Sequence, residues 1–238
     1  CASLSDHLEY TNRIDETPPT DAFAFVMVKK IAVPDKCLKS PLQGMCDEII
    51  QSLPPIVVRG TGSGLLVATD GQPVVLTAAH VCLPNFPDIH AFDDIVIKVR
   101  STSEVRIRTY HGEVLKGIIV AYDEEIDLCA VSVSSMFAPP VLLADGPPQL
   151  GDRTYAISAP YGINSPTMSL IFSGYYSGVD DEIHFYTIPT RPGSSGSVVL
   201  NGNFRAIGML NAAYRNMETI GIGPGYTDLK KFLSEIWD

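Results

Sequence analysis

The sequence Arg191-Pro192-Gly193-Ser194-Ser195-Gly196-Ser197 leads directly into the apolar run Val198-Val199-Leu200. Because glycine has no Cβ, the backbone can fold closely around Ser195 and expose its hydroxyl on a tight turn ahead of a strand. A turn of the same composition that only joins two strands is equally compatible with these residues. The segment on its own therefore leaves a nucleophilic serine and a plain turn both open.

Two segments further upstream offer partners for such a serine. Thr77-Ala78-Ala79-His80 places a base after an apolar run, and Asp127-Leu128-Cys129-Ala130-Val131 places a carboxylate at the start of another. A serine nucleophile needs a nearby base, and the base needs a carboxylate that holds it in one tautomer. An unpaired carboxylate beside an apolar strand is costly, so we expect Asp127 to be paired, the alternative being an aspartate that merely leads a strand. The other four histidines are interpreted as polar surface residues: His7, His90, His111 and His184.

The order His80, Asp127, Ser195, in the local sequences T-A-A-H, D-L-C-A-V and G-S-S-G-S, resembles that of the chymotrypsin-like (trypsin-fold) serine peptidases. Subtilisin-like enzymes use another order, and α/β-hydrolases carry G-x-S-x-G, whose last glycine is Ser197 here. The resemblance implies an all-β fold of two six-stranded antiparallel β-barrels with a C-terminal α-helix. It also implies a serine endopeptidase that forms an acyl-enzyme, with these three residues as the catalytic triad.

Short segments rich in β-branched residues follow one another closely along the chain, as in all-β barrels. We expect strands over residues 22–33, 56–69, 73–77, 94–100, 105–110, 113–121, 128–133, 153–158, 169–177, 183–188, 197–200 and 204–210. Helical spacing predicts a short helix at 47–53 and a terminal helix at 228–237 with Asp228 as its N-cap. Glycines at 60, 62 and 64 mark a strand that another backbone or a substrate approaches closely.

The predicted strands and helices divide the chain into four predicted parts. Residues 1–20 form a polar N-terminal arm, and residues 21–140 form the N-terminal barrel that carries His80 and Asp127. Residues 141–227 form the C-terminal barrel that carries Ser195, and residues 228–238 form the terminal helix.

The resemblance also assigns the groups around the scissile bond. It implies that the backbone N–H groups of Gly193 and Ser195 form the oxyanion hole. Digestive members of the family have an aspartate where Ser194 stands, so we expect no activation by an ion pair at this position. The residues assigned to the pocket for the P1 side chain are Pro189, Thr190, Leu210, Asn211, Ala213 and Gly225.

The P1 preference is predicted from what this pocket lacks. No acidic residue stands near Pro189 to receive a cationic side chain, and Leu210 stands where viral 3C-like and glutamyl peptidases have a histidine. An unpaired ion loses water there without compensation, whereas an apolar side chain gains from burial. We therefore expect cleavage after Leu, Met, Phe or smaller apolar residues.

Composition restricts the partners. The 238 residues are 45% hydrophobic and 18% charged, which is typical of a globular protein, and the formal charge of −10 argues against nucleic-acid binding. No apolar run approaches the roughly 20 residues that span a bilayer. The expected partner is a protein or peptide substrate, with no cofactor and no metal, and the sequence does not predict an oligomeric state.

The five cysteines of the chain indicate the cellular compartment in which the protein is expected. Cys1 followed by a polar segment is typical of a mature bacterial lipoprotein, which predicts membrane attachment through a lipidated Cys1; a trimmed chain is the alternative. Cys37 and Cys46 bracket a short loop that a disulfide would hold in an oxidising compartment. Cys82 and Cys129 could pair, but we expect two buried free thiols. The predicted location is extracytoplasmic, either secreted or surface-anchored, with a virion protein also open.

Three functional classes remain from the sequence. An active serine endopeptidase is favoured because three motifs agree. A protease-fold binding module that has lost turnover usually shows a broken triad, which this sequence does not. A structural component of a cell-envelope or virion assembly with little turnover is the third class.

Overall fold

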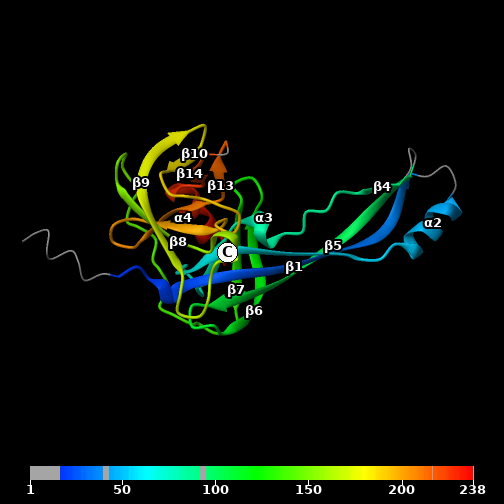
Figure 1. Cartoon of the computed structure of the whole chain (residues 1–238), viewed down its shortest axis with the longest axis horizontal. Coiled ribbons are helices and arrows are strands. Elements are labelled where there is room, and N and C mark those ends of the chain that lie inside the picture. The colour runs from blue at the N-terminus through cyan, green and yellow to red at the C-terminus, as the bar shows by residue number, and fades with distance from the viewer. Residues whose placement is uncertain (1–16, 40–42, 92–94, 216, 238) are drawn as a thin grey trace, which may run out of the picture.

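The computed structural model describes residues 17–39, 43–91, 95–215 and 217–237. Strands dominate this part of the chain, and two longer helices, one short helix and two 3-10 turns accompany them (Figure 1). In chain order the elements are η1 (Thr20–Ala22), β1 (Phe23–Lys39), α2 (Gln43–Ser52), β2 (Ile56–Val67), β3 (Val74–Thr77), α3 (Ala79–Cys82), β4 (Ile89–Ala91), β5 (Ile95–Thr109), β6 (Val114–Asp123), β7 (Leu128–Val133), β8 (Arg153–Ser158), η2 (Pro160–Gly162), β9 (Leu170–Asp180), β10 (Ile183–Tyr186), β11 (Ser197–Leu200), β12 (Ala206–Leu210), β13 (Ala212–Tyr214), β14 (Met217–Gly223) and α4 (Tyr226–Glu235).

The first half of the chain closes into a barrel. Its strands run in the order β1-β2-β3-β7-β6-β5, every neighbouring pair is antiparallel, and β5 pairs back to β1. Closure leaves no free edge where β5 pairs with β1, and all four residues of β3 are buried. The main hydrophobic cluster fills this barrel and continues into the second half through residues of β8, β11 and α4.

The second half is a curved antiparallel sheet in the order β12-β11-β8-β9-β10-β14-β13. Its ends approach each other where Gly208 and Gly225 form an isolated bridge and Met209 N–H donates to Pro224 O at 3.0 Å. A closed barrel, a half-barrel and the C-terminal helix α4 together confirm the predicted chymotrypsin-like fold class.

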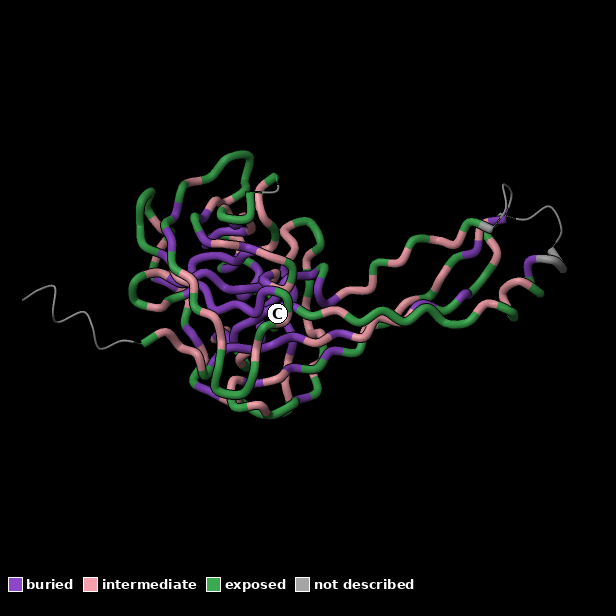
Figure 2. Tube along the Cα trace, in the orientation of Figure 1, coloured by how far each residue is buried: buried purple, intermediate pink, exposed green. Residues whose placement is uncertain are grey.

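Part of the first barrel projects well beyond the body of the molecule (Figure 1). This extension comprises residues 28–39, 43–61, 89–91 and 95–104, in which β1 pairs with β2 on one side and β5 on the other. Exposed and half-buried residues line most of its length (Figure 2). At its tip the Cys37–Cys46 disulfide, as predicted, joins β1 to α2, and a small cluster packs there: Cys46, Ile95, Ile97, Ile49, Ile50, Leu53 and Ile89.

The extension corrects several predicted boundaries. The strands predicted at 94–100 and 105–110 are the single strand β5, because its middle, residues 98–104, is exposed or half-buried and carries no apolar alternation. For the same reason β1 continues past residue 33 to Lys39. The short strands β4, β13 and β14 were not predicted. The strands at 128–133, 153–158 and 197–200 match β7, β8 and β11.

The predicted cap of the terminal helix is wrong by one turn. Gly225 is the N-cap of α4, and Asp228 stands three residues inside the helix. Its Oδ2 accepts the N–H of Gly225 at 2.9 Å, so the carboxylate still satisfies a backbone donor at the helix start.

The four predicted domain boundaries stay a prediction. Cys1 and most of the predicted polar N-terminal arm lie outside the described residues. Among the helices that the structure describes, none has the length and apolarity to cross a membrane.

Candidate active site

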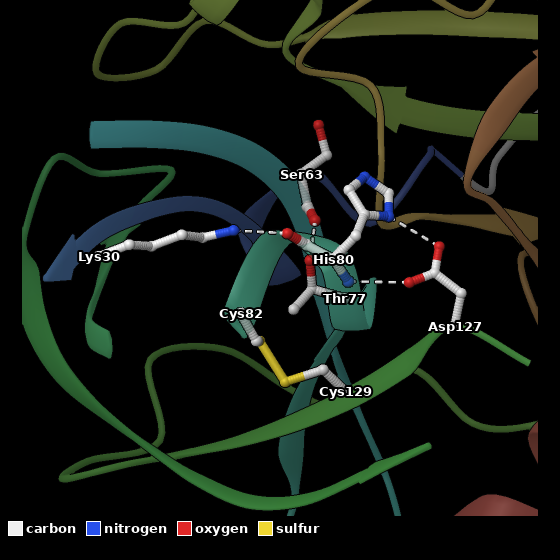
Figure 3. The surroundings of a disulfide bond; sticks show 7 residues. All are labelled: Lys30, Ser63, Thr77, His80, Cys82, Asp127 and Cys129. Carbon is white, nitrogen blue, oxygen red and sulfur yellow. Dashed lines mark hydrogen bonds and ion pairs between the residues drawn. A yellow bond between two sulfur atoms is a disulfide. The ribbon is translucent and has the colours of Figure 1, made fainter. Parts of the chain in front are cut away.

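His80 and Asp127 lie against each other in the first barrel (Figure 3). His80 Nδ1 is 2.7 Å from Asp127 Oδ2, and the backbone N–H of His80 donates to Asp127 Oδ1 at 2.8 Å. Both carboxylate oxygens therefore hold the same histidine. The His80 side chain is 50% exposed and that of Asp127 is 27% exposed, so the pair is open to a substrate.

The elements that carry the pair differ slightly from the prediction. His80 lies on the short helix α3, which begins two residues after β3, rather than at a strand end. Asp127 ends the turn before β7 with φ of 57°, a left-handed conformation that aspartate tolerates better than most residues. Its carbonyl accepts Ala79 N–H at 3.3 Å and Asn211 Nδ2–H at 2.9 Å. These bonds fix the strained residue from both halves of the molecule.

A disulfide joins the two elements that carry this pair. Cys82 and Cys129 each lie two residues after His80 and Asp127, and they are bonded to each other with both side chains fully buried (Figure 3). The prediction of free thiols is wrong, because antiparallel pairing of β3 with β7 brings α3 directly over the start of β7. The bond therefore constrains the spacing of α3 and β7.

Lys30 contributes a further contact that the sequence did not reveal. Its Nζ donates to His80 O at 2.6 Å (Figure 3), and burial lowers the pKa of this ammonium. The contact fixes the last turn of α3 to β1 at the root of the extension.

Ser195 lies on the predicted glycine turn. Gly193 has φ of 95° and Gly196 has φ of 87°, both in the region that glycine favours. A Cβ on Gly193 would lie 2.5 Å from Ala159 O, so the turn packs against the second sheet with no room for a side chain. Ser195 Oγ donates to Asn211 O at 3.0 Å, and among the described residues it has no bond to a histidine.

Hydrogen bonds to the carbonyl groups of Pro192 and Ser194 fix the direction of the N–H groups that were predicted to form the oxyanion hole. Pro192 O accepts Tyr161 N–H at 2.6 Å, and Ser194 O accepts Ser197 N–H at 3.0 Å. In a trans peptide the N–H of the next residue points away from the carbonyl. The N–H groups of Gly193 and Ser195 therefore point away from these partners, and neither donates to another described residue.

Ser63 is the residue that sequence reasoning missed most clearly. Its Oγ donates to Gly193 O at 2.8 Å and accepts Ala159 N–H at 2.9 Å, and its own N–H donates to Ser195 O at 2.9 Å. The glycines on either side of Ser63 in β2 were the feature of the sequence that could have identified it. A Cβ on Gly62 would lie 3.0 Å from Ser195 O, and one on Gly64 would lie 3.0 Å from Leu76 O. The predicted close approach is thus present at these two glycines.

The predicted pocket residues separate into two groups. Pro189, Asn211 and Ala213 are partly exposed, whereas Thr190, Leu210 and Gly225 are buried. Leu210 belongs to the hydrophobic cluster of the second half, and Thr190 Oγ1 donates to Ile188 O at 3.2 Å. Asn211 also connects the site, since its side chain holds Asp127 O and its carbonyl accepts the Ser195 hydroxyl.

The described residues hold no group of three or more His, Cys, Asp or Glu side chains placed to bind a metal ion. The two disulfides are typical of proteins in an oxidising, extracytoplasmic compartment.

The fold, the His80–Asp127 pair and the glycine turn around Ser195 define the class of trypsin-like serine peptidases. A family model agrees: the trypsin-like peptidase domain matches residues 62–209, more than half of the chain. The chain belongs to this family of peptidases, which are hydrolases that act on proteins or peptides. No curated protein matches the chain.

Proposed function

We propose that this protein is an active serine endopeptidase that cleaves peptide bonds through His80, Asp127 and Ser195. The observation that carries the proposal is the His80 Nδ1 to Asp127 Oδ2 contact of 2.7 Å. It leaves Nε2 of the same ring as the free nitrogen for a substrate or a nucleophile. Ser195 is tied to this pair because Asn211 binds both Asp127 and Ser195.

In the proposed reaction, Ser195 Oγ attacks the carbonyl carbon of the scissile bond. His80 Nε2 accepts the hydroxyl proton, while Asp127 accepts the Nδ1–H and stabilises the imidazolium. His80 then donates the proton to the leaving amine, and the acyl group remains on Ser195 until water, activated by the same base, hydrolyses the ester. In the structure Ser195 Oγ is bonded to Asn211 O, so this sequence begins with rotation of the hydroxyl toward His80.

The oxyanion that forms during attack requires donors in fixed positions. The N–H groups of Gly193 and Ser195 support this role because their peptides are held by Tyr161 and Ser197, and Ser63 holds the carbonyl of Gly193. The proposed hole does not depend on an ion pair at Ser194, whose buried side chain accepts Arg191 N–H at 3.4 Å.

We propose an apolar P1 preference. In this proposal the partly exposed residues Pro189, Asn211 and Ala213 contact the P1 side chain, and the buried residues Thr190, Leu210 and Gly225 support them. Arg191 is paired with Glu218 at 2.6 Å, so its charge is not free for an anionic substrate. A mid-sized apolar side chain gains roughly 1.5 to 3 kcal/mol on full burial.

The alternative is a protease-fold component of a cell-envelope or virion assembly with little turnover. The bond from Ser195 to Asn211 O favours it, because the hydroxyl rests on an acceptor that cannot take its proton. Profiling cleavage of a proteome-derived peptide library separates the two. We expect cuts after Leu, Met, Phe or smaller apolar residues, and none with Ser195→Ala. A clear majority of cuts after Arg, Lys, Glu or Gln would refute the pocket, and no cuts would favour the assembly role.

A further inference from the structure

One face of the extension is basic although the chain is acidic overall. In the register of β2, β1 and β5, Met27 faces Thr61 and Arg106, and Lys29 faces Arg59 and Glu104. Side chains of directly paired residues lie on the same face of a sheet, so these six share one face. Together with Val28 and Gly60 they line a cavity of about 460 Å³, called the basic face below.

The positive charge of the basic face is only partly neutralised. Lys29 pairs with Glu104 at 3.7 Å, whereas Arg59 and Arg106 are exposed and pair with no described carboxylate. The basic face therefore carries three cations and one carboxylate in a chain of formal charge −10. Such a local reversal of sign attracts an acidic ligand.

An open strand edge runs beside the basic face. β2 pairs with β1 along its length, but with β3 only from Leu65 to Val67, and the outer backbone groups of residues 56–61 bond to no described residue. Ile56, Val57 and Val58 are 42%, 46% and 47% exposed along this edge. A long apolar edge of this kind can accept an added strand, which supplies the missing backbone bonds.

The open edge of β2 continues into residues that contact Ser195. Ser63 N–H donates to Ser195 O, and Thr61 Oγ1 is 3.9 Å from a Cβ built on Gly162, which itself lies against Gly193. Asn211, one of the proposed pocket residues, contacts the Ser195 side chain through its carbonyl oxygen. An extended substrate whose acyl side occupies the pocket therefore continues over Thr61 with the residues that follow the scissile bond.

We propose that the basic face and the β2 edge bind an extended acidic segment of the protein substrate, located after the scissile bond. This inference rests on the proposed peptidase activity and specifies its substrate class. From Ser63 to Arg59 an extended chain advances about 13 Å, so acidic residues at about the third to sixth positions after the scissile bond meet Arg59 and Arg106. A polypeptide fits better than a nucleic acid, because only a peptide backbone satisfies the open edge.

Two fluorogenic peptides test the proposal. They share all residues up to the second position after the scissile bond and then carry either four Asp and Glu or four Asn and Gln. We expect kcat/KM of the intact protein to be about tenfold higher for the acidic peptide, mainly through KM, and the advantage to shrink at high salt. In R59Q/R106Q the ratio of the two values should fall to about one.

The matched control is R205Q/K230Q, which removes the same charge from exposed positions of the second half. It should keep the wild-type ratio. A ratio near one in the wild type, or the same loss of ratio in both double variants, would overturn the proposal.

A binding measurement keeps the proposal separate from the peptidase activity. If neither peptide is cleaved, the proposed function fails, but anisotropy of the labelled acidic segment still reports on the surface. We expect the intact protein to bind it about tenfold more tightly than R59Q/R106Q does. N-methylation of alternate backbone amides, in both registers, should abolish the binding. Equal binding by both proteins, or full affinity after N-methylation in both registers, would overturn the docking mode.

Discussion

The two halves of the molecule differ in how they hold the side chain that each contributes to the candidate site. In the first barrel, His80 is held through two bonds to Asp127, a backbone contact from Lys30 and a disulfide two residues further on. In the second half, Ser195 is positioned by its backbone, while its hydroxyl is bonded to Asn211 O.

This difference shows which part of the proposed reaction is organised before substrate arrives. In the proposed reaction, the base His80 is already paired with Asp127, and the N–H groups proposed as oxyanion donors are already directed by the bonds of the neighbouring carbonyl groups. The proposed nucleophile, Ser195, must first leave its bond to Asn211 O. The predictions below test this division, from the largest expected effect to the smallest.

Removal of the nucleophile should have the largest effect. Ser195→Ala is expected to lower kcat by about 10⁴-fold or more, because loss of one triad member removes most of the covalent route. The melting temperature should stay close to that of the wild type, since only one part-buried hydrogen bond, from Ser195 Oγ to Asn211 O, is lost. Steady-state hydrolysis and thermal unfolding measure both, with Ser234→Ala on α4 as a control that should behave like the wild type. Turnover near the wild-type value in Ser195→Ala would contradict the assignment.

A change in the second half alone should disable the oxyanion hole and spare the first barrel. In Gly193→Ala the new Cβ would meet Ala159 O at 2.5 Å, and φ of 95° disfavours a side chain. The turn must move, and we expect kcat to fall by about 10²- to 10³-fold. Gly202→Ala is the matched control, because nothing lies within 4 Å of its Cβ. A small effect in Gly193→Ala would show that these amides do not serve as donors.

The two disulfides allow a comparison of the body with the extension. Cys82 and Cys129 are 47 residues apart, and Cys37 and Cys46 are 9 apart. Chain entropy predicts a loss of about 4 kcal/mol for the first bond and about 2.6 kcal/mol for the second. Double alanine variants of each pair, unfolded in urea, measure the difference. Only the first should also lower activity, since it joins the elements of His80 and Asp127; the opposite order would exclude this role.

The smallest expected effect concerns a histidine of the second half. His184, interpreted from the sequence as a polar surface residue, is in fact half-buried. Burial lowers the pKa of His184, and Asp228 raises it to a lesser extent. The unfolded chain therefore binds a proton near pH 6.5 that the folded state takes up only at lower pH, so His184 makes the protein lose stability as pH falls below about 6.5. His184→Gln should reduce the loss of stability between pH 7 and pH 5 in urea unfolding. An unchanged pH dependence would contradict this.

The sequence predicted the fold class because the strands that build the body alternate or bury their side chains in recognisable runs. β7, β8 and β11 were found at their actual bounds for this reason. The length of the strands in the extension was not predicted, because residues 98–104 in the middle of β5 are exposed or half-buried and show no apolar pattern.

The sequence also predicted the main residues of the candidate site but not the residues that support them. The motifs identified His80 and Asp127, which the structure brings together, and placed Ser195 on the glycine turn. The supporting residues Ser63 and Lys30 were not found, because a serine and a lysine in strands carry no motif and act through contacts between distant segments. The Cys82–Cys129 bond was also missed, because it joins two segments that are 47 residues apart in the sequence.

The central claim is that Ser195 is a nucleophile activated by His80. Reaction of the intact protein with a fluorophosphonate, followed by mass mapping, tests it most directly. We expect the adduct on Ser195, and a rate of labelling that falls by several powers of ten in His80→Ala. An unmodified Ser195, or equal labelling of wild type and His80→Ala, would contradict the claim.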